Sequence, residues 1–253
     1  MTALAVTTGN SATGVVLVAL AVLSGQLSIG WLNDLLDADR DVATGRTDKP
    51  LAAGEIGRHT VSVATGAAVV ACVVLSVVAA GPVGGVLHLV AVGAGLAYDL
   101  VLKSTPVSLL PYLVCFALLP VFVVASLPGS PVPPWWLPVA GGLLGGGAHF
   151  ANVLPDLDDD AATGVRGLPH VLGARMSRWA AAVLLLGATT VIALAASVPV
   201  WLAASVPVLA AVLLGAGFVL GRRPGSRAPF RAVLLVAVLA VVLLLVAGPA
   251  VVA

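Results

Sequence analysis

Charged residues are scarce in this sequence. Lysine, arginine, aspartate and glutamate together make up 9% of its 253 residues, whereas ordinary soluble domains carry about a quarter. An ordinary soluble domain is therefore excluded, because so few charges cannot cover a globular surface. The net charge of +1 gives no reason to expect a nucleic-acid partner.

Cysteine is also rare. The two cysteines, Cys72 and Cys115, fall in apolar stretches and do not have the spacing of metal ligands. We expect them to be small packing residues rather than a disulfide, a zinc site or a catalytic thiol.

Long apolar stretches are abundant instead. Hydrophobic residues make up 60% of the chain, and a run of about 18 or more is typical of a membrane span. About eight such stretches occur, and only helices satisfy their own backbone in lipid. They lie near 11–35, 60–80, 83–103, 106–127, 135–155, 177–198, 200–221 and 230–252. With no linker between them, the sequence predicts an all-α, polytopic membrane bundle forming a single domain over residues 1–253.

The charged residues are expected to fall on one side of this bundle. If the chain crosses the bilayer at each stretch, all of them lie in, or at the helix ends beside, the loops at 36–59, 103–105, 156–178 and 221–231. The turns on the opposite side carry none. Since positive residues concentrate in the cytoplasm, we expect a multi-pass protein of the cell (plasma) membrane, with any active site on the charged side facing the cytoplasm.

Most of the acidic residues gather in two short segments. Each segment holds four of the 11, and in each an asparagine and two aspartates are spaced i, i+4, i+8. The two triplets are Asn33, Asp37 and Asp41, and Asn152, Asp156 and Asp160. Each would lie along one face of a helix wherever the helix continues that far. Pro155 is placed to distort the second helix near its end.

Carboxylates one helical turn apart repel each other unless a cation lies between them. Mg²⁺ prefers oxygen ligands and commonly combines one or two carboxylates with waters and substrate phosphates. Two such clusters facing each other would hold about two or three Mg²⁺ ions against a diphosphate. The alternative is that the aspartates are solvated helix ends or topology signals, although acidic residues contribute little to topology.

The first segment resembles the N-D-x-x-D-x-x-x-D motif of the UbiA superfamily of intramembrane prenyltransferases, residue for residue. The matching residues are Asn33, Asp34, Asp37 and Asp41. The second segment resembles the D-x-x-x-D motif of that family, with Asp156 and Asp160 at the fixed positions. Between them, 48–54 is similar to the family's basic Pro-Leu loop, and 98–103 to the Tyr-to-Lys segment that ends its fourth helix. The motifs occur in the family's order.

The resemblance implies a Mg²⁺-dependent prenyltransferase in a helical bundle with a lipid-open cavity. Such an enzyme moves an isoprenyl group from an isoprenyl diphosphate donor to an acceptor, a small aromatic or lipophilic molecule. A membrane terpene cyclase on the same scaffold would use the same aspartates. Outside the enzymes, a transporter or non-catalytic scaffold is the alternative. The oligomeric state is not indicated.

The resemblance also implies roles for individual residues. The expected metal ligands are Asp34, Asp37, Asp41, Asp156, Asp158 and Asp160. The residues expected to bind the diphosphate are Asn33, Arg46, Lys49, Lys103, Asn152 and Arg166, with a positive-inside anchor as the alternative for each basic one. Asp37, Asp156 and Tyr98 are the expected catalytic residues. Tyr98 is as readily explained as an interfacial aromatic, and the adjacent Asp99 is expected to point elsewhere.

The resemblance is incomplete at the N-terminus. The family has nine spans, and its first aspartate motif closes the second of them. Here that motif closes the first countable span, so the family's first helix is expected to be missing or truncated, with residues 1–6 as a remnant.

Overall fold

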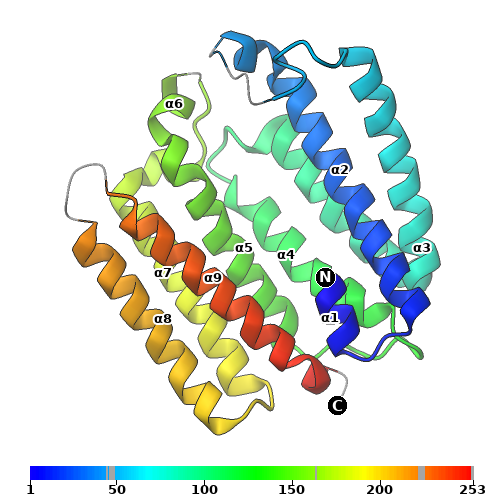
Figure 1. Cartoon of the computed structure of the whole chain (residues 1–253), viewed down its shortest axis with the longest axis vertical. Helices are drawn as coiled ribbons and strands as arrows, with labels where there is room; N and C mark the ends of the chain where they lie inside the picture. The colour runs from blue at the N-terminus through cyan, green and yellow to red at the C-terminus, as the bar shows by residue number, and fades with distance from the viewer. Residues whose placement is uncertain (44, 46–48, 163, 222–225, 252–253) are drawn as a thin grey trace.

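The computed structural model describes residues 1–43, 45, 49–162, 164–221 and 226–251, without the side chains of 158, 159 and 250. Every regular element in these residues is a helix, and the longer helices pack side by side (Figure 1). The helices are α1 Thr2–Thr7, α2 Ala12–Ala43, α3 Arg58–Ala97, α4 Leu109–Ala125, α5 Trp136–Val153, α6 Leu157–Ala162, α7 Leu168–Ala195, α8 Val200–Leu220 and α9 Ala228–Val246. Three short elements are η1 Tyr98–Leu102, which is π-helical, η2 Leu154–Asp156 and η3 Gly248–Val251. The predicted all-α fold is confirmed.

The helix α3 consists of two helices that fold back on each other. The backbone leaves the helical conformation at Gly81, where φ is 66° and ψ is −177°. On either side of this turn, Ser76 Oγ and His88 Nδ1 are hydrogen-bonded at 2.7 Å. Residues 12 apart on a straight helix would be about 18 Å apart, so the chain must reverse between them. The turn needs glycine because a Cβ is excluded from this backbone region.

The backbone of α7 also bends, near the start of the helix. Gly173 has a φ of 74°, and Ser177 Oγ donates a hydrogen bond to the carbonyl oxygen of Pro169 at 3.2 Å. Eight residues along a straight helix span about 12 Å, so Leu168–Leu172 turns away from the rest. The long part of α7 therefore begins after Gly173, close to the predicted start of that span at residue 177.

Each of the eight predicted apolar stretches is helical. Within the described residues, five segments are long and apolar enough to cross a membrane, namely Ala12–Ala43, Arg58–Leu102, Leu168–Ala195, Val200–Leu220 and Ala228–Val246. The segment Arg58–Leu102 accounts for two predicted stretches because it is folded back at Gly81. The apolar helix α4 has 17 residues, and the many glycines of α5 dilute its hydropathy. The chain is a multi-pass membrane protein.

The glycines of α5 bring this helix against α4. A Cβ on Gly141 would lie 2.2 Å from the carbonyl oxygen of Phe116, and a Cβ on Gly145 would lie 2.4 Å from that of Tyr112. Small residues permit such close approach of helix backbones in membranes. The contact sets the start of α4 beside the end of α5, where the Asn152 amide lies 3.4 Å from the Tyr112 hydroxyl.

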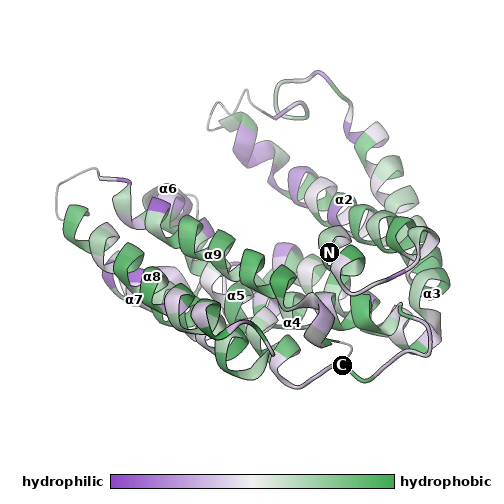
Figure 2. Cartoon of the chain, turned by 60° about the horizontal axis from the view of Figure 1, so that its bottom comes forward, coloured by the Kyte–Doolittle hydropathy of each residue, from purple (hydrophilic) through white to green (hydrophobic). Residues whose placement is uncertain are grey.

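The two ends of the bundle differ in polarity. Figure 2 shows hydrophilic residues gathered at the end formed by α6, the last turns of α2 and the neighbouring loops. The short helix α1 packs at the opposite end, where Leu4 and Ala5 are buried and Thr7 contacts Gly248 of η3. The residues predicted as a remnant therefore form one short helix, of which Leu4 and Ala5 are buried.

Candidate active site

The first aspartate motif occupies the last turns of α2, where cations from two elements reach it. Lys103, directly after η1, places its ammonium 2.7 Å from Asp37 Oδ1. Arg40, one turn further along α2, lies 2.9 Å from the second oxygen of Asp37. Asp37 is buried, and its two cationic partners offset the cost of removing its charge from water.

Lys49 contacts the other two aspartates of this motif. Its Nζ lies 2.9 Å from Asp34 Oδ1 and 2.9 Å from Asp41 Oδ2. Burial disfavours the charged ammonium, but the hydrogen bonds and charges of Asp41 and Asp34 outweigh it and raise the pKa of Lys49 above its usual value. Lys49 is therefore held against α2 as a cation.

The position between Asp34 and Asp41 also suits a divalent cation. The donors are carboxylate oxygens, which hard cations prefer, and the Lys49 ammonium shows that a positive charge fits between them. Among the residues that the structure describes, no three histidine, cysteine or acidic side chains are already grouped as metal ligands. A metal ion bridging these two aspartates would thus require Lys49 to move away.

The second aspartate motif follows a break in the helix. Helix α5 ends at Val153, the 3₁₀ turn η2 contains Pro155, and α6 begins at Leu157. Proline lacks the N–H that would continue the helical hydrogen bonds, so the predicted distortion at this residue is confirmed. Asp156 is exposed and Asp160 is half-buried.

Asp160 lies within electrostatic reach of the first motif. Burial raises the pKa of Asp160, and the charges of Asp156 and Asp37 add to that rise, while Arg40 and His170 oppose it. Asp37 and Arg40 both belong to α2, far from α6 in sequence. The charges of the two aspartate motifs therefore act on each other at the polar end of the bundle.

A cavity of about 330 Å³ lies directly beneath the first motif. Its polar end is formed by Tyr98, Asp99, Tyr112 and Asn152, and its apolar walls include Val22, Ile29, Phe116 and Leu119. The rings of Tyr98 and Tyr112 meet edge to face with centroids 5.1 Å apart. Tyr98 thus lines the cavity and is not an interfacial anchor.

Asp99 also lines this cavity, which corrects the expectation that it points elsewhere. It is 7% exposed, and the Asn33 amide, with its nitrogen turned toward the carboxylates, donates to Asp99 Oδ1 at 3.2 Å and to Asp37 Oδ2 at 3.1 Å. The wide π-helical turn of η1 brings Tyr98 and Asp99 closer to one face than an α-helix would. The sequence did indicate that Asp99 lies near the site, because Asp99 precedes Lys103 by four residues and so shares its side of a helix.

His149 packs against the two tyrosines that line the cavity. This buried residue has its ring centroid 4.8 Å from that of Tyr112 and 5.9 Å from that of Tyr98. Its Nε2 lies 3.2 Å from Ser108 Oγ, which also accepts a hydrogen bond from the backbone N–H of Leu168. His149 thus helps to join the start of α7 to the loop before α4.

Of the predicted site residues, one lies in a separate pocket, and two others concern parts of the chain outside the described residues. Arg46 lies outside the described residues, and so does the side chain of Asp158. Arg166 is exposed and lines a separate pocket with Leu157 and His170, between α6 and α7.

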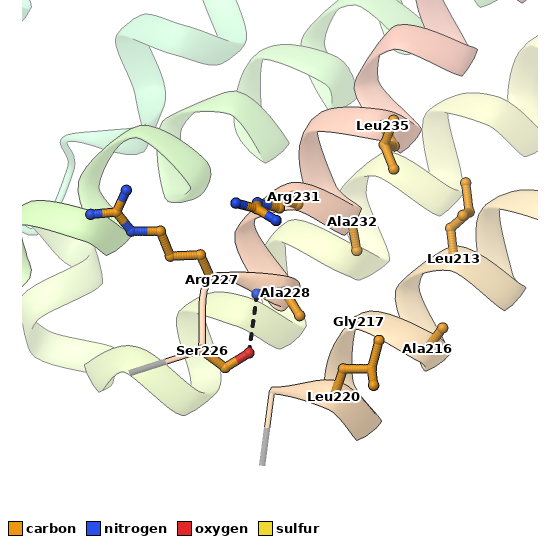
Figure 3. A pocket seen from close by; sticks show the side chains of 10 residues that line it. All are labelled: Leu213, Ala216, Gly217, Leu220, Ser226, Arg227, Ala228, Arg231, Ala232 and Leu235. Atoms are coloured by element: carbon orange, nitrogen blue, oxygen red, sulfur yellow. Dashed lines mark hydrogen bonds between the residues drawn. The ribbon is translucent and has the colours of Figure 1, made fainter. Parts of the chain in front are cut away.

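A further groove, of about 540 Å³, lies between α8 and α9 (Figure 3). Arg227 and Arg231 border it together with Gly217, Leu220 and Leu235. None of the described residues that line this groove is acidic. It therefore offers no carboxylate ligands and is separate from the aspartate site.

The fold and the site together define a class: an all-helical membrane protein with two aspartate motifs at its polar end and a partly apolar cavity beside the first of them. The UbiA prenyltransferase family matches residues 1–235. The chain belongs to this family, and its enzyme class is that of a prenyltransferase.

Solved structures agree with this fold. The apo structure of a UbiA homolog from Aeropyrum pernix K1 is 16% identical with a TM-score of 0.73, over 96% of this chain and 93% of that one. A UbiA homolog from Archaeoglobus fulgidus bound to GPP and Mg²⁺ is 18% identical with a TM-score of 0.71, over 99% and 94% of the two chains. A structure of digeranylgeranylglyceryl phosphate synthase is 15% identical with a TM-score of 0.68, over 98% and 89%. A search of the curated proteins found no match.

Proposed function

We propose that this protein is a Mg²⁺-dependent intramembrane prenyltransferase that moves an isoprenyl group from an isoprenyl diphosphate to a small aromatic or lipophilic acceptor. The observation that carries the proposal is the group of Asp34, Asp37 and Asp41 with Lys49 and Lys103 among them, above a largely apolar cavity. The homologs from Archaeoglobus fulgidus bound to GPP and to DMAPP, each with Mg²⁺, support this type of donor and this metal.

The polar end of the bundle would bind the diphosphate. The proposed metal ligands are Asp34, Asp37 and Asp41 from α2 and Asp156, Asp158 and Asp160 from the second motif. Bound Mg²⁺ would neutralise charge on the diphosphate. Lys103 and Lys49 are anchored within this group of acids, and each can turn its ammonium toward phosphate oxygens. We assign Asn33 and Asn152 to hydrogen bonds with the same group.

The reaction begins when the bond between the allylic carbon and the diphosphate oxygen breaks. The electron pair leaves with the diphosphate, whose growing charge is stabilised by the preorganised cations around it. Positive charge then develops on the allylic carbon. The rings of Tyr98 and Tyr112 border the cavity, and aromatic faces stabilise such a cation. The acceptor supplies the electron pair for the new bond, and the proton that it then loses passes to the released diphosphate.

The apolar walls suggest where the isoprenyl chain lies. Val22 and Ile29 from α2 and Leu119 from α4 continue the cavity away from the acids, and burial of a hydrocarbon chain there is favourable. We place the protein in the plasma membrane with the aspartate end toward the cytoplasm, because the basic residues gather at that end. We treat residues 1–253 as one domain.

The proposal is tested with membranes that contain the protein, a set of allylic diphosphates and Mg²⁺. Each donor is incubated with and without a phenolic acceptor, and products are identified by mass spectrometry. Donor consumption that depends on the phenol, with a prenylated product, is expected. A cyclic hydrocarbon formed without acceptor would instead identify a terpene cyclase. Unchanged donor in every incubation would contradict both activities.

A further inference from the structure

One buried oxygen in the cavity has no partner within the protein. Asp99 Oδ2 is buried and accepts no hydrogen bond, while Oδ1 of the same carboxyl group receives the Asn33 amide. A buried acceptor without a donor is costly, and native proteins rarely leave one unless a ligand or water completes it. Asp99 is one of the residues that line the cavity beside the first motif.

The residues around Asp99 Oδ2 determine which chemical groups can bind beside it. The described residues lining the cavity include no lysine and no arginine. The nearest cations are already engaged outside it, Lys103 with Asp37 and Lys49 with Asp34 and Asp41. A carboxylate or phosphate placed beside Asp99 would therefore be repelled by it, and Lys103 and Lys49 would offset that repulsion only from outside the cavity.

The rest of the cavity suits a flat, apolar molecule. Tyr98 and Tyr112 border it at the level of Asp99, and Phe116 and Leu119 continue it deeper. Its volume of about 330 Å³ is roughly ten times the share of one water molecule. With the isoprenyl chain along Val22 and Ile29, the space beside Tyr98 and Tyr112 is left for the acceptor.

We propose that Asp99 binds the acceptor substrate, and that this acceptor is an uncharged lipophilic ring with a hydroxyl or amino group and no carboxylate or phosphate beside it. The O–H or N–H of the acceptor donates to Asp99 Oδ2, and the ring packs against Tyr98 and Tyr112. This inference rests on the proposed transferase activity. It makes Asp99 a residue that selects among acceptors, in addition to the aspartates assigned to the metal and diphosphate.

A matched pair of probes tests the inference. 1-Naphthol carries only the hydroxyl, and 1-hydroxy-2-naphthoate adds a carboxylate beside it; both are fluorescent. Their dissociation constants are measured by fluorescence anisotropy with the full chain in lipid nanodiscs, after subtraction of the signal from empty nanodiscs. Wild type is expected to bind 1-naphthol about 10-fold or more tightly than the naphthoate, because the added carboxylate is repelled by Asp99. Equal binding, or preference for the naphthoate, would overturn the inference.

Two variants refine the test. Asp99→Asn keeps the shape but places an N–H donor where the acceptor was, so the preference for 1-naphthol should fall about 10-fold. Asp39→Asn is the control, because Asp39 is exposed and pairs with Arg58 on the surface; its preference should match wild type. An unchanged preference in a folded Asp99→Asn protein would also overturn the inference. If Asp99→Asn fails to fold, the wild-type comparison decides alone.

Failure of the inference and failure of the proposed function give different results. Release of diphosphate from an allylic donor with Mg²⁺ reports the transferase site, whichever acceptor is used. If wild type releases diphosphate but shows no preference between the probes, only the acceptor assignment is wrong. If wild type releases none with any donor and acceptor, the proposed function is wrong.

Discussion

The ammonium of Lys103 lies 2.7 Å from a carboxylate oxygen of Asp37, although the two residues are 66 positions apart in the sequence. Asp37 comes from α2, and Lys103 follows the second half of the folded-back helix α3. The Asn33 amide donates to both Asp37 and Asp99 beside this pair. The proposed site therefore depends on the packing of α2 against the returning half of α3.

Lys49 is expected to compete with the metal. Lys49→Gln removes the cation that lies 2.9 Å from both Asp34 and Asp41, so Mg²⁺ should bind the substrate-free protein about 10-fold more tightly. Isothermal titration calorimetry in detergent measures this affinity. Lys49→Arg retains the charge and should stay close to wild type. An identical Mg²⁺ affinity for Lys49→Gln and wild type would show that the ammonium and the metal do not share a position.

The turn at Gly81 is expected to be essential for stability. Gly81→Ala forces a Cβ into a backbone conformation with φ 66° and ψ −177°, which costs about 1–3 kcal/mol in a non-glycine residue. The unfolding temperature in detergent should drop by several degrees. Gly66→Ala, in the first half of α3, is the matched control because a Cβ added there would have no neighbouring atom within 4 Å. Equal unfolding temperatures for the two variants would refute the strained turn.

The contact between α4 and α5 gives a separate prediction. A Cβ on Gly145 would lie 2.4 Å from the Tyr112 carbonyl oxygen and 2.5 Å from the Phe116 Cβ, so Gly145→Ala should destabilise the protein by about 1–3 kcal/mol through overpacking. It should also lower activity, since Tyr112 borders the cavity. Gly93→Ala adds a methyl group where no atom lies within 4 Å and should be neutral or slightly stabilising. A Gly145→Ala protein as stable and active as wild type would contradict this packing.

The helices could be predicted from the sequence because a chain in lipid must satisfy its own backbone hydrogen bonds. A long apolar run must become a helix, and the pair Gly81-Pro82 marks the turn between two of them. The bend at Gly173 was not predicted, since a single glycine within an amphipathic segment is compatible with a straight helix. Its positive φ accompanies the hydrogen bond from Ser177 to the carbonyl oxygen of Pro169, a contact that the sequence alone does not indicate.

The candidate site was only partly predictable. The i, i+4 spacing of Asp37 and Asp41 indicated one helical face, and that depends on local geometry alone. The place of Asp99 depended on the π-helical turn of η1, and the partners of Lys49 and Lys103 depended on how distant segments pack. Arg166 resembled a phosphate ligand by position in the chain, yet it lines a separate pocket between α6 and α7.

The most direct test of the account is diphosphate release from geranyl diphosphate by purified protein in the presence of a phenolic acceptor, with and without Mg²⁺. Asp37→Ala and Asp156→Ala should each lower the rate about 100-fold or more, as expected when charge stabilisation at the reacting group is lost, and EDTA should abolish it in wild type. Asp39→Ala, whose side chain is 91% exposed, should retain the wild-type rate. Undiminished release by Asp37→Ala and Asp156→Ala, or release that persists in EDTA, would contradict the proposed metal–diphosphate site.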